Sequence, residues 1–113
     1  MDFDLTAINR GNTYVVSVRG DVDVYTAPRL DACITAGLDA GSTSIALDLE
    51  NCTYFDSEGI KVLLRAARRL GKSGNVIIVG ALGGVQRVFQ ISGLDEVFRI
   101  LPSLHSLTGF PES

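Results

Sequence analysis

The segment TSIALDLENCTYFDSEGIKVLLRAARRL, residues 43–70, decides the fold, because it changes from the period of a strand to the period of a helix. Its first seven residues, TSIALDL, contain the apolar run Ile45–Leu47 and Leu49 and predict a strand. Apolar residues then recur at spacings of three and four and predict a helix from Ser57 to Leu70. The inner stripe of this helix should be Ile60, Leu63, Leu64, Ala67 and Leu70.

The residues before this segment predict a β-hairpin followed by a helix. Residues 3–9 and 13–20 read as strands on either side of a turn at Gly11-Asn12. A helix should run from about Thr26 to Ala40, with Thr26 as N-cap and a proline in its first turn. Its inner face should comprise Ala27, Leu30, Cys33, Ile34, Gly37 and Leu38.

The residues after it continue the alternation of strand and helix. VIIVG at 76–80 is apolar on both faces, as a buried parallel strand would be. A helix follows over about 84–91, then a short strand at 96–101 and a last short helix at 102–107. We therefore predict a single domain, residues 1–113, of the α/β class. It should have a mixed, mainly parallel central β-sheet, an N-terminal β-hairpin and about four α-helices.

Composition limits the function classes. Apolar residues make up 46% of the 113 residues and charged residues 20%, which allows a packed core and argues against disorder. A net charge of -3 without a basic tail disfavours nucleic-acid binding. No apolar run is long enough for a membrane span, and the acidic start MDFDLTAINR does not resemble a signal peptide. We expect a cytoplasmic protein that binds neither membrane nor nucleic acid.

The thiols and the histidine do not predict a metal site. Cys33 and Cys52 lack CxxC spacing, and His105 is distant in sequence, so these residues cannot supply the four ligands of a zinc site. Two reduced, partly buried thiols are the simplest expectation. A disulfide between Cys33 and Cys52 is the alternative.

Catalytic interpretations of Ser57 are incomplete. The serine lies at a strand-to-helix turn with Gly59 two residues later, as in a GxSxG nucleophile elbow, but Phe55 replaces the leading glycine. Only His105 could act as its base. The GKS sequence at 71–73 lacks the upstream glycine of a phosphate loop and follows a helix instead of preceding one. We predict no enzyme activity, with a Ser57 hydrolase as a minor alternative.

Acidic residues gather near the expected strand ends, where ligands bind in open α/β sheets. They could hold a divalent cation, but acids are also favoured in turns and first helical turns. We predict no metal and no cofactor. The residues are Asp21, Asp23, Asp48, Glu50, Asp56 and Glu58.

Three segments together resemble the STAS domain family, and more narrowly its stand-alone bacterial anti-sigma factor antagonists. They are GDVDVYTAPRL at 20–30, IALDLENCTYFDSEGIKVLL at 45–64 and GNVIIVGALGGVQRVFQISGLDEVF at 74–98. The resemblance spans nearly the whole chain. Its strongest marks are Gly20 with Asp23, the Asp-Ser-x-Gly turn at 56–59, and Ser-Gly-Leu at 92–94.

This resemblance implies a partner-switching regulator. Such antagonists bind an anti-sigma factor that is also a serine kinase of the GHKL type, and binding releases the sigma factor. The kinase phosphorylates a hydroxyl residue at the start of the helix that follows the Asp-Ser turn, and the phosphorylated form dissociates. Phosphate adds roughly -1.5 to -2 charges, which a helix N-terminus tolerates and a packed partner surface does not.

The chain departs from the family motif at the acceptor position, where Glu58 replaces the second hydroxyl residue. Glu58 could mimic the phosphorylated state, a partner could have adapted to it, or Ser57 could be the acceptor. Against the last option, Ser57 is well placed to cap the helix, which would engage its hydroxyl. The implied partner-binding surface comprises Asp23, Asp56, Ser57, Glu58, Gly59 and Lys61.

Two other features leave alternatives open. A basic stripe on the second helix, opposite its apolar face, could meet an acidic partner; it comprises Lys61, Arg65, Arg68, Arg69 and Lys72. The resemblance also allows a small-ligand sensor that binds a nucleotide near Asp23, Asp56 and Ser57. A weak homodimer is a further option.

Overall fold

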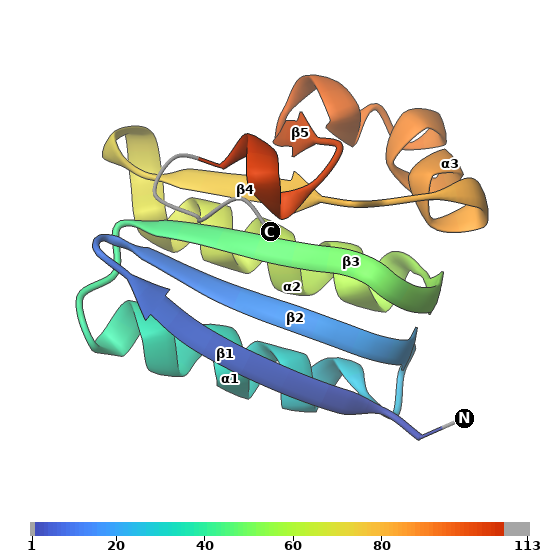
Figure 1. Ribbon diagram of the computed structural model, residues 1–113, viewed down its shortest axis with the longest axis horizontal. Helices are drawn as coiled ribbons and strands as arrows, with labels where there is room; N and C mark the ends of the chain where they lie inside the picture. The colour runs from blue at the N-terminus through green and yellow to red at the C-terminus, as the bar shows by residue number, and fades with distance from the viewer. Residues whose placement is uncertain (1, 108–113) are drawn as a thin grey trace.

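The computed structural model describes residues 2–107, and the strands in this range form one mixed sheet (Figure 1). The strands lie in sequence order: β1 (Asp4–Arg10), β2 (Thr13–Val22), β3 (Ser44–Phe55), β4 (Asn75–Val79) and β5 (Arg99–Leu101). β1 and β2 form an antiparallel hairpin, and every later neighbour pair is parallel. The predicted mixed sheet, mainly parallel with an N-terminal hairpin, is therefore confirmed.

Three α-helices connect or follow the parallel strands: α1 (Ala27–Asp39), α2 (Ser57–Leu70) and α3 (Gly83–Ile91). Their bounds agree with the expected helices to within one residue. Short 3₁₀ turns complete the described chain: η1 (Gly71–Ser73), η2 (Leu94–Glu96) and η3 (Leu104–Ser106).

The C-terminal part differs from expectation in two places. The helix predicted for residues 102–107 is only the turn η3, because six residues beginning with a proline are too few to nucleate an α-helix. The strand predicted for 96–101 shortens to β5, because Leu94–Glu96 turns as η2 and buries Leu94 in the core.

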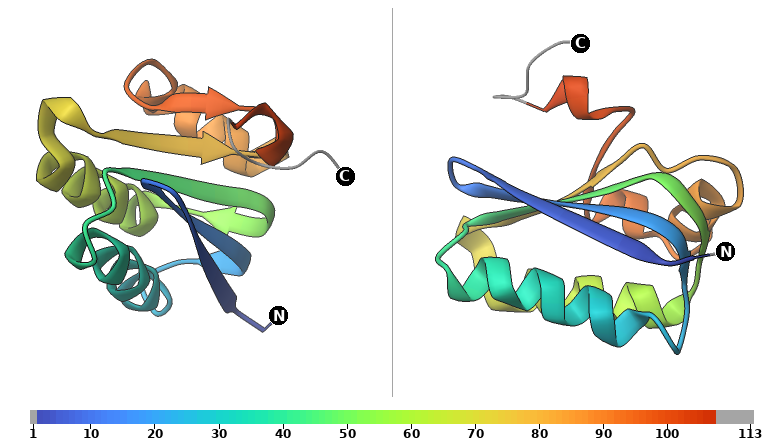
Figure 2. Two further views of the ribbon diagram at one scale, coloured as in Figure 1. Left: turned by 60° about the vertical axis from the view of Figure 1, so that its left-hand side comes forward. Right: turned by 60° about the horizontal axis from the view of Figure 1, so that its bottom comes forward.

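The sheet has a thick core on one face and a thin one on the other. α1 and α2 lie side by side on one face (Figure 2), and the buried side chains of α3, Val85 and Phe89, belong to the same core. On the opposite face, Val15, Ala46, Ile77 and Val79 form a smaller cluster with Leu107, and Leu101 and Leu104 pack against it. The start of α2 therefore lies at the edge of the main core.

The buried side of α2 is rotated by about one residue relative to the predicted stripe. Its buried residues are Gly59, Val62, Leu63 and Ala66. Leu64 is exposed, and Ile60, Ala67 and Leu70 are only half-buried. The helix is turned so that its flank packs on α1, where Arg65 and Arg69 pair with Asp31 and Asp39.

Within the described range, none of the helices combines the length and the apolar composition that a membrane crossing requires.

Candidate functional site

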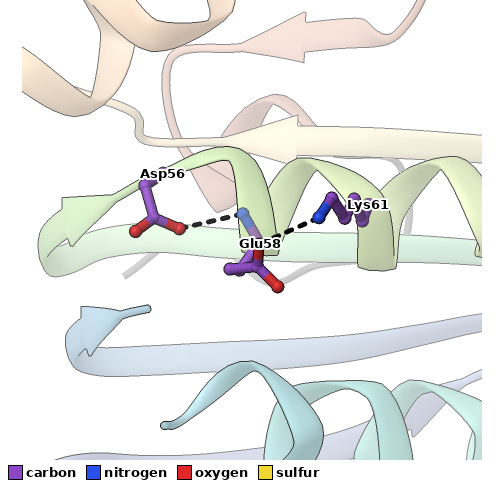
Figure 3. A network of polar contacts seen from close by, with 3 residues as sticks. All are labelled: Asp56, Glu58 and Lys61. Atoms are coloured by element: carbon purple, nitrogen blue, oxygen red, sulfur yellow. Dashed lines mark hydrogen bonds and ion pairs between the residues drawn. The ribbon is translucent and has the colours of Figure 1, made fainter. Parts of the chain in front are cut away.

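The start of α2 is capped by Asp56 and not by Ser57. Asp56 has an extended backbone (φ -125°, ψ -167°), and its Oδ1 accepts a hydrogen bond from the Glu58 N–H at 2.9 Å (Figure 3). Ser57 is the first helical residue and is exposed, and its hydroxyl makes no hydrogen bond within residues 2–107. The expectation that Ser57 caps the helix was wrong. Both residue types are good N-caps, but only Asp56, with its extended backbone, can accept a hydrogen bond from an N–H of the first helical turn.

Glu58 lies in the first turn and pairs with the next turn of the same helix. Its Oε2 is 3.0 Å from Lys61 Nζ, and the exposed fractions of the two side chains are 33% and 61%. A pair this exposed contributes at most about 0.5 kcal/mol to folding. The carboxylate also meets the positive end of the α2 dipole. Glu58 therefore places a partly compensated negative charge at the start of α2.

Gly59 is at this turn because of packing. It is buried, and a Cβ there would lie 2.5 Å from Cζ of Phe55. Phe55 is itself 2% exposed and packs on Phe89, with ring centroids 5.3 Å apart. The glycine lets α2 begin directly over this aromatic pair, which fixes the position of Asp56 and Ser57.

The second predicted segment, around Asp23, is a tight loop between β2 and α1. Asp23 Oδ1 accepts from the N–H groups of Tyr25 (2.9 Å) and Thr26 (3.1 Å). The Thr26 hydroxyl donates to the carbonyl of Asp21 at 2.7 Å and accepts from the Asp23 N–H at 3.0 Å. Thr26 precedes α1 as predicted, but its side chain binds this loop and does not cap the helix. Asp23 is thus occupied in shaping the loop.

Tyr54 lies between the two segments. The charge of Asp56 is the main cause that raises the pKa of the Tyr54 phenol, with smaller contributions from burial, a hydrogen bond to Asp56, and the charges of Asp23 and Asp21. Asp21 also pairs with Tyr54 across β2 and β3, so the loop after β2 and the start of α2 lie at the same edge of the sheet and form one acidic surface. Asp21 is held in place by the Thr53 hydroxyl, whose Oγ1 is 2.6 Å from Asp21 Oδ1.

Exposed apolar side chains border this acidic surface. Tyr25 is 85% exposed, Val24 is 59% exposed and Tyr54 is 50% exposed. They were not among the predicted site residues, although Val24 and Tyr25, an aliphatic and an aromatic residue in a polar turn, were a usable signal in the sequence. We call these three residues with Asp23, Asp56, Ser57 and Glu58 the α2 docking surface.

The remaining acids do not assemble into a metal site. No group of three or more His, Cys, Asp or Glu side chains within residues 2–107 could hold an ion. Asp48 is buried and accepts from the Ser17 hydroxyl at 3.0 Å and the Glu50 N–H at 3.1 Å. It is a structural residue of the sheet, and the suggested cation site is not formed.

The predicted disulfide alternative is wrong, because both cysteines are free. Burial raises the pKa of the Cys33 thiol, and it raises the pKa of Cys52 to about 11. Both thiols are therefore protonated near neutral pH and poorly nucleophilic.

The structure also argues against a Ser57–His105 pair. The turn η3, which carries His105, follows β5 and packs on the sheet face opposite α2.

The predicted basic stripe on α2 is largely engaged in ion pairs. Arg65 and Arg69 pair with α1, and Lys61 pairs with Glu58. Only Arg68 and Lys72 of the stripe make no ion pair in the described chain, so a continuous free basic face is not present.

Known proteins share this fold over nearly their whole length. An anti-sigma-B factor antagonist from Staphylococcus aureus is 29% identical over 101 residues, which are 88% of this chain and 94% of that protein. The crystal structure of an anti-sigma factor antagonist from Mycobacterium paratuberculosis superimposes with a TM-score of 0.85 at 28% identity, covering 93% of this chain and 90% of that one.

The antagonist SpoIIAA matches in two states. Its unphosphorylated form gives a TM-score of 0.72 at 28% identity, covering 88% of this chain and 87% of that one. Its phosphorylated form, described as a Bacillus cell fate determinant, gives 0.65 at 27%, covering 88% and 90%. The model of the STAS domain matches residues 4–107. The chain therefore belongs to the STAS domain family.

Proposed function

We propose that this protein acts as a single STAS domain and an anti-sigma factor antagonist, which binds an anti-sigma factor through the α2 docking surface. The observation that carries the proposal is the start of α2. There, an exposed Ser57 and a charged Glu58 adjoin the exposed Tyr25 and Tyr54 in a fold whose full-length relatives are named as antagonists. The role is regulatory and not enzymatic.

The surface has the composition of a protein interface. Exposed tyrosines give large contact area at low entropic cost, and such residues dominate binding energy at interface centres. The acids of the loop, Asp21 and Asp23, favour lysine or arginine at the edge of the partner, which speeds encounter and orients the complex. A charge added at Ser57 would instead lie under the packed centre of the interface, where its desolvation weakens binding. An anti-sigma factor of the GHKL serine-kinase type is the partner we propose.

Glu58 sets the charge of this surface in the present chain. The relative SpoIIAA exists in unphosphorylated and phosphorylated forms, and a phosphate at a helix start carries more charge than a carboxylate. Because Lys61 compensates part of the Glu58 charge, the carboxylate is a weaker repulsive element than a phosphoserine would be. We propose that Glu58 tunes affinity and that an exposed Ser57 is the remaining acceptor for a kinase.

The proposal is tested by titrating the purified protein against each anti-sigma factor encoded in the same genome, using isothermal calorimetry. At least one should bind with 1:1 stoichiometry. Glu58→Ser restores the hydroxyl and removes the charge, while Glu58→Gln removes the charge alone. If Glu58 mimics phosphate, both variants bind at least tenfold more tightly and Glu58→Ser becomes a kinase substrate. Absence of binding by the wild type and by Glu58→Ser would contradict the function itself.

A further inference from the structure

A groove of about 470 Å³ runs between the first turns of α2 and the outer face of α3. Its floor includes the buried Phe55, its α2 wall includes Ile60, and its α3 wall includes Val88 and Ile91. The volume lies in the range of roughly 300–1,000 Å³ that is typical of binding clefts. Tyr54, Asp56 and Ser57 line one end of the groove, so the groove continues from the α2 docking surface toward α3.

The walls of the groove carry more apolar side chains than is usual for an exposed surface. Ile60 and Val88 are half-buried, and Ile91 projects with 80% of its surface exposed. Single exposed apolar residues are common, but a hollow lined by several of them marks a binding surface. An occupant would cover Ile91 and one side of Tyr54 at the same time.

The position of the groove favours a helix as occupant. On its far flank, α2 packs on α1 and is tied to it by ion pairs such as Arg65–Asp31 at 3.6 Å. On the groove flank, no ion pair joins α2 to α3 within residues 2–107. The groove is a gap in the helical layer with one helix on each side. Amphipathic helices bind such gaps through apolar residues at positions i, i+3 or i+4, and i+7.

Charge defines the occupant further. Arg87 lines the α3 wall and makes no ion pair in the described part of the chain. The one carboxylate in the lining, Asp56, is already engaged as the cap of α2 and by Tyr54. A partner carboxylate beside Arg87 would therefore be favoured, and a partner cation there would be repelled.

We infer that this groove receives an amphipathic helix of the anti-sigma factor, with aliphatic side chains on Ile60, Val88 and Ile91 and an acidic side chain on Arg87. The inference rests on the proposed function and adds a second contact to it. Phosphorylation then has a second effect. A phosphate on Ser57, at the rim, repels an acidic helix in the groove, and it must also be desolvated beneath a partner on the docking surface.

The test uses two fluorescein-labelled 18-residue amphipathic peptides that share a leucine stripe. They differ only in flanking residues, which are glutamate in one and lysine in the other. Fluorescence anisotropy should show the glutamate peptide binding at least tenfold more tightly than the lysine peptide. Arg87→Glu should reverse this preference, and Ile91→Asn should weaken binding of the glutamate peptide at least tenfold. Arg68→Glu, which makes the same charge change on an exposed position outside the groove, should leave both affinities unchanged.

Equal affinities across these variants, or no binding of either peptide, would overturn the inference. Binding of dodecanoate in the groove with no binding of either peptide would overturn it in favour of a small amphiphilic ligand. Binding of the same variants to an anti-sigma factor distinguishes failure of this inference from failure of the proposed function. A complex that tolerates Ile91→Asn but is weakened by Ser57→Asp would retain the function and exclude the groove, whereas no complex with any anti-sigma factor would remove the function.

Discussion

Replacing Gly59 by alanine tests whether packing fixes the position of the α2 start. Two effects oppose each other. Alanine is a better helix former than glycine by about 1 kcal/mol, which would stabilise the protein. Its Cβ, however, would lie 2.5–2.8 Å from ring atoms of Phe55, which is 2% exposed and confined by Phe89. Overpacking of a buried site costs about 1–3 kcal/mol, so we expect net destabilisation by about 1 kcal/mol.

The magnitude can be measured by thermal unfolding. With an unfolding entropy of roughly 2.1 cal/mol/K per residue, 1 kcal/mol corresponds to about 4 °C in the Tm of a chain of this size. Gly84→Ala is a matched control, because Gly84 also lies near the start of a helix and an added Cβ would meet no atom within 4 Å. It should be neutral or raise the Tm. A second variant, Phe55→Leu combined with Gly59→Ala, should recover part of the loss. If Gly59→Ala raised the Tm as Gly84→Ala does, the packing argument would be refuted.

Three further predictions concern the same region and the thiols. Asp56→Ala should lower the free energy of unfolding by about 1 kcal/mol in urea titrations, because Asp56 caps α2. Ser57→Ala should change it by less than about 0.5 kcal/mol. A larger loss for Ser57→Ala than for Asp56→Ala would contradict the cap assignment. The variant Cys33→Ser leaves Cys52 as the single thiol. Iodoacetamide should alkylate it at pH 8 at least about tenfold more slowly than it alkylates free cysteine, and the rate should rise toward pH 11. A rate that levels off near pH 9 would show that Cys52 is an ordinary thiol. In the same variant, stability should fall as the pH rises from about 9 to about 11, because folding favours the protonated thiol, and chemical unfolding at several pH values measures this.

The secondary structure was largely predictable because local sequence patterns determine it. The change from strand to helix period around Asp56 and the hairpin turn at Gly11 were both confirmed. Each depends on neighbouring residues only, such as an apolar alternation or a glycine, which at Gly11 has φ 63°. The C-terminal helix was wrong because a short periodic segment after Pro102 carries too little local signal.

The site was less predictable because its details depend on tertiary contacts. The inner face of α2 was misplaced by one position, since almost every uncharged residue of this helix is apolar and only packing on α1 decides the rotation. The choice between Asp56 and Ser57 as cap depends on backbone angles that neither residue type dictates. The groove beside Ile91 exists because α3 stands apart from α2, which no local pattern encodes.

The most direct test of the central claim, that charge at the start of α2 controls docking, compares Ser57→Asp with Ser57→Asn. Both side chains have nearly the same size on an exposed position, so only the charge differs. Calorimetric titration against the cognate anti-sigma factor should show Ser57→Asp binding at least tenfold more weakly than Ser57→Asn, with both variants keeping the wild-type Tm within about 2 °C. Equal affinities of the two folded variants would contradict the account.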